Sequence, residues 1–189
     1  MTLRILTVTV ACVVAPFIAH AACPTQADMA KGVVTKTDDG QVEIHKTAAK
    51  DMVQVQVQYS DGTGDGSVMQ FGHGIYLRNV IPIEGGVLRL AEQEKYASDA
   101  TLRSWAAPVP NATWSNTRSD GGSAKSGPAK KVRIGNCSYE GFTVTLGFAD
   151  DPNYVEVYQY IPSLGIGLLT EILENGDRDR YRYTSIAKQ

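Results

Sequence analysis

Oxygen-bearing side chains recur at alternate positions in one short stretch of the chain, at Asp61, Thr63 and Asp65. This spacing is similar to the first part of an EF-hand calcium loop, in which such side chains ligate the ion. The twelfth position of that loop is a bidentate glutamate, whereas this chain has Gly72 there, and strand patterns flank the stretch. We therefore interpret the stretch as a Gly/Asp-rich hairpin loop, with a weak, partly hydrated calcium contact as the alternative.

Two histidines lie beyond the first 21 residues, His45 and His73. His73 stands between two glycines in an expected turn, where it is exposed enough to act as a base or a ligand. A small hydrolase that uses His73 with carboxylates of the 61–65 loop is therefore one hypothesis. His45 is expected to face solvent, because the apolar residues of its strand, Val42 and Ile44, take the other face.

Catalytic motifs of the common kinds do not occur in the sequence. The chain contains no G-x-S-x-G, H-E-x-x-H or P-loop pattern, each of which brings a nucleophile, a metal or a phosphate to a defined place. The favoured hypothesis is therefore a protein that is not an enzyme, with no catalytic residue and no cofactor.

Tyrosines gather late in the chain, and alternation places three of them, Tyr154, Tyr158 and Tyr160, on one strand face with Glu156. Tyrosines on one sheet face can form a ligand platform, because each has an apolar body and a polar tip. The alternative is packing within or over the sheet. These three tyrosines and Trp114 are the candidate ligand-binding residues.

The chain has three cysteines, Cys12, Cys23 and Cys137. Cys12 lies in a segment that we expect to be removed, and the remaining pair favours a disulfide in an oxidising compartment. The alternatives are a redox dithiol, which normally has C-x-x-C spacing, and a metal pair, for which two lone thiols are a poor zinc site. We predict a structural disulfide between Cys23 and Cys137.

The elements that must position these residues are strands, because the dominant pattern has a period of two. Residues 52–59 alternate apolar residues with glutamine, and residues 142–148 alternate large apolar residues with small ones. The one plausible helix lies between residues 92 and 105. Further strands are expected at 32–37, 41–46, 67–71, 75–81, 86–90, 154–161, 166–173 and 180–186.

These elements predict a mainly β fold: a single antiparallel sheet, curved or closing into a partly open, barrel-like meander, with at most one or two short helices. Residues 106–131 are rich in Pro, Gly and Ser, and we expect a long surface loop there that contains a short hairpin of 113–118 with 130–134. The alternative is a mobile binding loop that carries Trp105 and Trp114.

The expected disulfide joins the start of the chain to its second half, so residues 22–189 are predicted to be one domain.

A short internal similarity relates the two halves of this domain. The segments are Gly74-Ile75-Tyr76-Leu77 and Gly165-Ile166-Gly167-Leu168, each placed after an alternating strand, a turn and another strand. The pattern is compatible with two similar meanders that contribute to one curved sheet.

The first residues of the chain have the three parts of a secretory signal. Arg4 is the only charge, residues 5–18 are mostly apolar, and Ala19 and Ala21 supply an A-x-A cleavage pattern. A membrane-spanning helix needs about 20 apolar residues, and this run is shorter. We predict cleavage after Ala21, with Ala22 as the alternative, and a periplasmic or secreted protein.

A second reading of this region makes Cys23 the acylated first residue of an outer-membrane lipoprotein. Such a signal usually has an aliphatic residue three places before the cysteine, where this chain has His20. Acylation would also leave Cys137 without a partner. The lipoprotein is therefore kept as the alternative localisation.

Charge excludes some classes of partner. The whole chain has 18 basic and 20 acidic residues, and removal of Arg4 with the signal leaves a formal charge of −3. This weakly acidic balance argues against nucleic acid and anionic membrane surfaces as main partners. The sequence contains no second apolar stretch long enough to span a bilayer, so no transmembrane anchor is expected after cleavage.

Three short motifs stand near the two ends of the predicted domain: Cys23-Pro24-Thr25 with Asp28, Met29 and Gly32; Ile134-Gly135-Asn136-Cys137-Ser138-Tyr139-Glu140; and Tyr160-Ile161-Pro162-Ser163-Leu164-Gly165-Ile166-Gly167-Leu168-Leu169. Together they resemble a family of uncharacterised secreted proteins of alphaproteobacteria. This resemblance implies export and the β fold but no activity. The Tyr-x-Pro-x-Leu-Gly part of the last motif is also similar to envelope proteins of the lipoprotein-carrier kind, in which a curved sheet holds an apolar ligand.

The function expected from the sequence is that of an exported periplasmic module that is not an enzyme and that binds an apolar small molecule or an envelope protein. The hydrolase with His73 and a purely structural envelope protein are the alternatives. The hydrolase hypothesis requires His73 to lie near the carboxylates of the 61–65 loop, whereas the binding hypothesis requires the candidate tyrosines to face a ligand.

Overall fold

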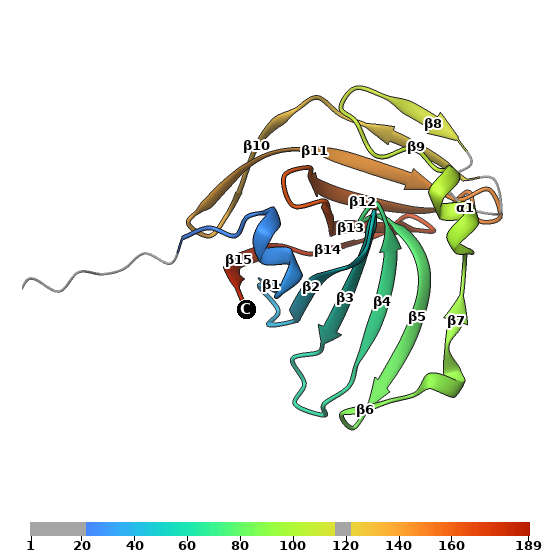
Figure 1. Ribbon diagram of the computed structural model, residues 1–189. Coiled ribbons are helices and arrows are strands. Elements are labelled where there is room, and N and C mark those ends of the chain that lie inside the picture. The colour runs from blue at the N-terminus through green and yellow to red at the C-terminus, as the bar shows by residue number, and fades with distance from the viewer. Residues whose placement is uncertain (1–21, 116–121) are drawn as a thin grey trace, which may run out of the picture.

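The computed structural model describes residues 22–115 and 122–189, except for the side chains at 99, 100 and 103 (Figure 1). The mainly β class predicted from the alternating patterns is confirmed. Over the described residues the strands are divided between two antiparallel sheets rather than one, and they do not close into a barrel. In Figure 1 the first sheet stands upright, and the strands of the second lie across its upper end.

Each sheet is a series of antiparallel neighbours. The first contains, in spatial order, β15 (Tyr183–Lys188), β1 (Val33–Thr37), β2 (Val42–Ala49), β3 (Met52–Gln58), β4 (Gly66–Gly72), β5 (Tyr76–Glu84) and β6 (Val87–Leu88), with β7 (Glu94–Lys95) also paired to β5. The second contains β14 (Asp177–Arg180), β13 (Ile166–Glu174), β12 (Tyr154–Ile161), β11 (Cys137–Gly147), β9 (Ser123–Ser126) and β8 (Thr113–Ser115), with β10 (Lys130–Ile134) also paired to β11. The described helical segments are short: η1 (Gln26–Ala30), η2 (Leu90–Glu92) and α1 (Asp99–Ser104).

The alternation of β3 and β11 decides which faces turn inward. On β3 the valines at 53, 55 and 57 are buried, while the side chains between them are partly exposed. On β11, Phe142, Val144 and Leu146 are buried in the same way. Burial of such side chains stabilises a fold by about 1.5–3 kcal/mol each. The β3 valines belong to one core cluster with Ile166 and Leu168 of β13, and the β11 residues belong to a second cluster next to α1.

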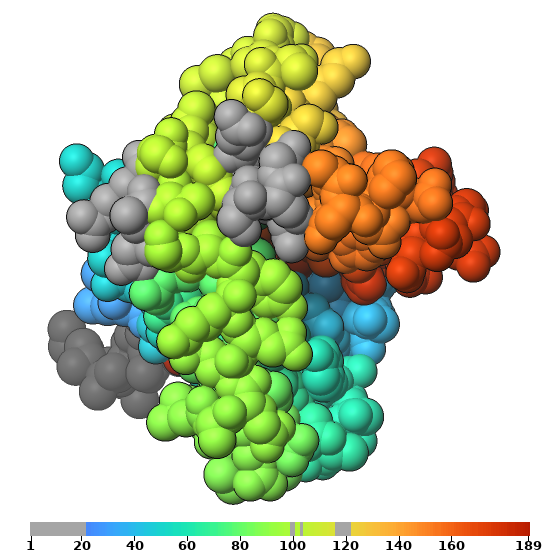
Figure 2. All heavy atoms as spheres, turned by 90° about the vertical axis from the view of Figure 1, so that its right-hand side faces the viewer, coloured from blue at the N-terminus to red at the C-terminus, as the bar shows by residue number. Residues whose placement is uncertain are grey.

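The helix predicted between residues 92 and 105 is confirmed as α1. Its first turn is capped by Ser98, whose Oγ accepts a hydrogen bond from the Thr101 N–H at 3.2 Å. Leu102 and Trp105 are buried at its end, and the Trp105 ring packs edge-on against Tyr76 at 5.0 Å. Trp105 therefore belongs to the core rather than to a mobile loop. In Figure 2 the yellow-green segment that follows β6 runs up this face of the molecule toward β8.

The predicted hairpin of residues 113–118 with 130–134 is wrong. β8 pairs with β9, and β10 pairs with the first residues of β11. The reason is chain proximity: Ile134 is opposite Cys137 across a two-residue turn in which Gly135 has a φ of +55°. Closure of so short a loop costs less entropy than pairing with a strand that lies some fifteen residues earlier.

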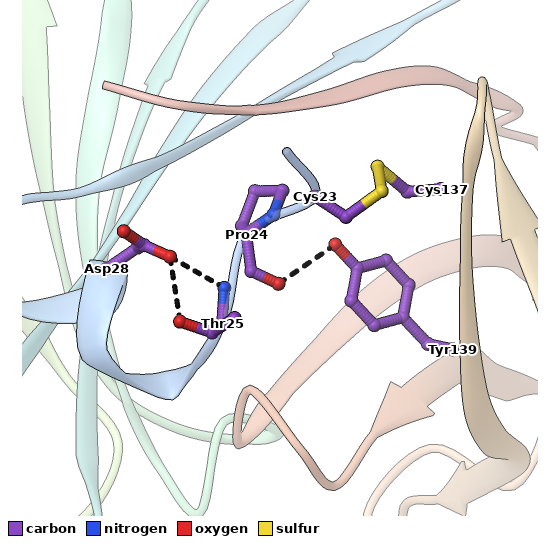
Figure 3. Close-up of a disulfide and its surroundings, with 6 residues drawn as sticks. All are labelled: Cys23, Pro24, Thr25, Asp28, Cys137 and Tyr139. Carbon is purple, nitrogen blue, oxygen red and sulfur yellow. Dashed lines mark hydrogen bonds between the residues drawn. A yellow bond between two sulfur atoms is a disulfide. The ribbon is translucent and has the colours of Figure 1, made fainter. Parts of the chain in front are cut away.

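The predicted disulfide between Cys23 and Cys137 is present, with a Cα–Cα distance of 5.5 Å (Figure 3). The Tyr139 hydroxyl donates to the Pro24 carbonyl at 3.2 Å, and Asp28 accepts bonds from the Thr25 amide and hydroxyl at 2.8 Å each. The bridge spans 114 residues. On the chain-entropy model such a loop contributes about 4–5 kcal/mol, and in practice less. The bridge fixes η1 and the start of the first sheet to β11.

A second connection between the sheets is continuous chain. β14 lies at the edge of the second sheet and β15 at the edge of the first, with Tyr181 and Arg182 between them. The Tyr181 N–H donates to the Thr170 carbonyl of β13 at 2.9 Å, and the Arg182 carbonyl accepts from the Asp38 N–H at 2.9 Å. Tyr181 is thus bound to the second sheet and its neighbour Arg182 to the first. These two bonds hold the edges of the two sheets together.

A third connection brings the two glycine–isoleucine segments into direct contact. The Gly167 N–H donates to the Gly74 carbonyl at 3.0 Å. A Cβ at Gly74, where φ is +75°, would lie 2.2 Å from the Gly165 carbonyl oxygen. Only glycine allows the backbones to approach so closely. The two similar segments, 74–77 and 165–168, therefore meet where the sheets are in backbone contact.

Replacement of Gly74 tests this contact, and Gly62 provides a matched control. Both have nearly equal positive φ values, but a Cβ at Gly62 meets no atom within 4 Å. We expect Gly62→Ala to cost about 1–2 kcal/mol for the left-handed backbone alone, and Gly74→Ala to cost about 1–3 kcal/mol more for the clash. Urea unfolding of the two variants measures the difference. Equal losses in the two variants would contradict the close contact.

Candidate ligand-binding cavity between the sheets

The inner faces of the two sheets line a cavity of about 470 Å³ that opens to solvent, within the range of small-molecule sites. Much of its wall is apolar. The apolar side chains include Val55 and Val57 on β3, Met69 and Phe71 on β4, and Leu169 and Ile172 on β13. Both sheets therefore contribute, and a molecule in this cavity would be held between them.

On the wall formed by β12, two of the four candidate residues face the cavity. Tyr154 and Tyr158 line it together with Glu156, as the predicted shared face requires. Both hydroxyls donate to the Glu156 carboxylate at 3.0 Å. Burial, together with the nearby carboxylate charge, raises the pKa of Tyr158 well above its ordinary value, so this hydroxyl stays protonated and acts as a donor.

The structure places the other two candidates, Tyr160 and Trp114, away from the cavity wall. Tyr160 packs against Phe142 with ring centroids 5.4 Å apart, in the core next to α1. Trp114 donates from Nε1 to the hydroxyl of Tyr76 at 2.7 Å, and that hydroxyl donates to the Ala106 carbonyl at 2.7 Å. Trp114 thus joins the 106–115 segment to the core, and Tyr160 is part of the core itself.

The cavity wall also contains a buried polar network centred on Glu43 and His45. These side chains are only 8 % and 1 % exposed. The prediction that His45 faces solvent is therefore wrong. The register explains why: Glu43 is opposite Val57 and His45 is opposite Val55, so both share the inward face of β3. The neighbouring strand, not the hydrophobicity of β2 itself, decides which face of β2 is buried.

Four donors surround the Glu43 carboxylate. They are the Tyr183 hydroxyl at 2.9 Å, the Gln41 amide at 3.0 Å, the His45 Nε2 at 3.1 Å and the Thr35 hydroxyl at 3.3 Å. Burial by itself raises the pKa of Glu43, but the hydrogen bond and Coulombic attraction of His45 and the bonds from Tyr183 and Gln41 outweigh it, and the net pKa lies below its ordinary value. Glu43 is therefore a carboxylate at neutral pH.

The charge on Glu43 fixes the proton on His45. A carboxylate only accepts hydrogen bonds, so the Nε2 atom that faces it must carry hydrogen. The other ring nitrogen, Nδ1, is buried and has no hydrogen-bond partner among the described residues. A neutral imidazole ring carries hydrogen on only one nitrogen. Because Nε2 carries it here, Nδ1 is the acceptor in the neutral ring.

His73 and the 61–65 loop lie at opposite ends of β4, so the structure does not bring together the residues named in the hydrolase hypothesis. The seven residues of β4 span about 23 Å at the usual rise of a strand, so no carboxylate of the loop reaches His73. His73 itself is in a turn, with φ +49°, where its N–H donates to the Asp51 carbonyl at 2.7 Å. Its ring packs edge-on to Tyr76.

Side chains of the 61–65 loop bind the loop itself and the turn that follows β5. Asp61 accepts from the amide and hydroxyl of Thr63 at 3.0 and 2.7 Å, and Asp65 accepts from the Gly85 N–H at 2.7 Å. Within residues 22–115 and 122–189, no three His, Cys, Asp or Glu residues gather where they could hold a metal ion. The loop therefore has the hydrogen bonding of a hairpin connection.

Compared with protein-family models, curated proteins and solved structures, the chain gives no significant match in any of the three sets. The resemblance to secreted proteins of alphaproteobacteria stays a prediction.

Protonation of Glu43 provides a test of the network. Because the pKa of Glu43 is lower in the folded than in the unfolded protein, its contribution to stability is complete above the unfolded value of about 4.3. That contribution is lost as the pH falls through the lower, folded pKa. Glu43→Gln should cost about 1–3 kcal/mol at pH 7 and should weaken the loss of stability toward low pH.

Urea unfolding between pH 7 and pH 3 measures both effects. Replacement of the exposed Glu92 by Gln is the control. The free energy of unfolding of this variant should depend on pH as that of the wild-type protein does. A Glu43→Gln variant with the wild-type profile would show that the carboxylate is not the group that titrates.

Proposed function

We propose that this protein is an exported binding module, not an enzyme, and that the cavity between its sheets holds a small, mainly apolar ligand. The observation that supports this most is the cavity itself, about 470 Å³ with apolar side chains from both sheets. Large, mostly apolar pockets with a few convergent polar groups are the usual sites of small-molecule binding. The side chains of β3, β4 and β13 provide the apolar surface, and β2 and β12 provide the polar groups.

Binding is favoured over catalysis because the polar groups do not form a nucleophilic pair. Ser67 also lines the cavity, but the register runs from Glu43 to Val57 and then to Ser67, with β3 between. Strands lie about 4.8 Å apart, so the backbones at Glu43 and Ser67 are separated by about 10 Å. At this separation the Ser67 hydroxyl does not contact the Glu43–His45 pair.

Export is supported by the disulfide, which persists in oxidising compartments. The predicted signal segment and its cleavage site at Ala21 lie outside the described residues. Cys23 uses its sulfur in the bond to Cys137, and an outer-membrane lipoprotein would need that sulfur for its acyl group. Among the described residues, the helices are all too short or too polar to cross a bilayer. We therefore favour a periplasmic or secreted protein over the lipoprotein.

An envelope protein partner is the second candidate, and one surface favours it. Val87, Leu88 and Leu90 follow β5 at its far end and are 56 %, 42 % and 67 % exposed. Exposed apolar clusters of this kind mark contacts with other molecules more often than isolated apolar residues do. A partner would then bind at the tip formed by residues 87–90, outside the cavity.

Binding of the neutral fluorescent probe N-phenyl-1-naphthylamine tests the main proposal. We expect its fluorescence to rise when it enters the cavity. Ile172 lines the cavity on β13, and the next residue, Leu173, pairs with Val155 on the opposite face. Ile172→Trp fills part of the cavity and should weaken binding by about tenfold or more, the equivalent of about 1.4 kcal/mol.

Leu173→Trp is the matched control, because it adds the same side chain one residue away on the outer face. It should bind the probe as the wild-type protein does. Equal weakening by both substitutions, or by neither, would contradict a ligand site between the sheets.

A further inference from the structure

The Glu43 end of the cavity has one unused polar atom, and it is not on the carboxylate. A carboxylate offers about four lone-pair positions, and Glu43 is approached by four donors, from Thr35, Gln41, His45 and Tyr183. Its capacity for hydrogen bonds is therefore filled by the protein. A ligand in the cavity does not find a free acceptor on Glu43.

His45 Nδ1 is the atom that the network leaves unfilled. The ring is 1 % exposed, Nδ1 has no hydrogen-bond partner among the described residues, and His45 is part of the cavity wall. A buried polar atom without a partner costs about 1–3 kcal/mol, and nearly all such atoms in native proteins are satisfied. His45 lines the cavity, so a molecule there is the nearest candidate partner; Nδ1 itself has almost no accessible surface and is reached when the neighbouring side chains shift.

We propose that His45 Nδ1 is the specificity-determining acceptor of the cavity, and that the ligand has an apolar body with one hydroxyl or N–H donor directed at it. This inference rests on the proposed function and names the class of ligand. Glu43 acts as the positioning residue, because its bond to Nε2 fixes the hydrogen there and holds the ring. Thr35 and Tyr183 in turn hold the carboxylate.

The same geometry selects against anionic ligands. A carboxylate on the ligand would present lone pairs to the lone pair of Nδ1, and it would lie near the negative charge of Glu43. Like charges repel more strongly next to a buried carboxylate such as Glu43 than in water, since less water screens them there. The cavity should therefore prefer an alcohol, phenol or amide over a fatty-acid type of ligand with the same apolar body.

Three probes that share one naphthalene ring separate these possibilities on the full chain. 2-Naphthol has a donor, 2-methoxynaphthalene has the same oxygen without the donor, and 2-naphthoate has a carboxylate. Each is titrated as a competitor of N-phenyl-1-naphthylamine. We expect 2-naphthol to bind about tenfold more tightly than 2-methoxynaphthalene, and 2-naphthoate to bind most weakly.

His45→Phe keeps a ring of similar shape and removes the acceptor. In this variant 2-naphthol should fall to the affinity of 2-methoxynaphthalene, while 2-methoxynaphthalene binds as it does to the wild-type protein. A merely structural role for His45 would weaken both probes together. His73→Phe, which alters a turn at the end of β4, is the matched control and should keep the preference for 2-naphthol.

Because His45→Phe removes one donor from Glu43, a measurement on the wild-type protein accompanies it. The ring nitrogens of ¹⁵N-labelled histidine report directly on hydrogen bonds, and the signals that are missing from the His45→Phe variant are those of His45. The resonance of the unprotonated nitrogen should shift with 2-naphthol and stay in place with 2-methoxynaphthalene.

The outcomes separate the inference from the function on which it rests. If none of the probes displaces N-phenyl-1-naphthylamine and that probe does not bind either, both are overturned. If 2-naphthol and 2-methoxynaphthalene compete equally well and the nitrogen signal does not move, the cavity binds ligands but His45 does not select them. Tighter binding of 2-naphthoate would show that Nδ1 is a donor and would also overturn the inference.

Discussion

A carboxylate held away from water requires hydrogen-bond donors, and Glu43 obtains its donors from β1, β2, β15 and the turn before β2. This requirement ties the first hairpin of the chain to its last strand, because Tyr183 lies on β15 and reaches Glu43 on β2. It also determines the hydrogen on His45. The polar end of the cavity is thus a single connected group, and the orientation of its one unused atom follows from the charge at its centre.

The sheets share an apolar core cluster to which β3, β4 and β13 contribute, and they are also joined at three separate places. Backbone contact at Gly74 and Gly167, the chain passing through residues 181–182, and the Cys23–Cys137 bond each hold the sheets together locally. Between these connections the inner faces line a space that side chains leave open. Each connection depends on a feature that packing alone does not supply: a missing side chain, a continuous backbone or a covalent bond.

The sequence allows the fold class, the inward face of β3 and the cysteine pair to be predicted, because local alternation and cysteine count determine them. The same reasoning places Tyr154 and Tyr158 beside Glu156 on one face. It fails for His45, since the buried face of β2 is decided by the register with β3, a nonlocal property. The sequence does contain a pattern that indicates this buried polar face. A hairpin with its turn at residues 38–40 places Thr35 opposite Glu43, so polar side chains form a row on one face. Alternation also puts Tyr160 on the predicted face, and Trp114 is a candidate by residue type alone; only the positions of α1 and β8 show that both pack in or against the core.

Location of the bound molecule is the most direct test of the account. Two-dimensional ¹H–¹⁵N spectra of the protein, titrated with N-phenyl-1-naphthylamine, report where the probe binds. The account predicts that the largest shifts fall on strands whose side chains line the cavity, at Val55, Val57 and Leu169, and on His45. Shifts confined to the exposed tip at residues 87–90, or spread thinly over the outer faces, would contradict a binding site between the sheets.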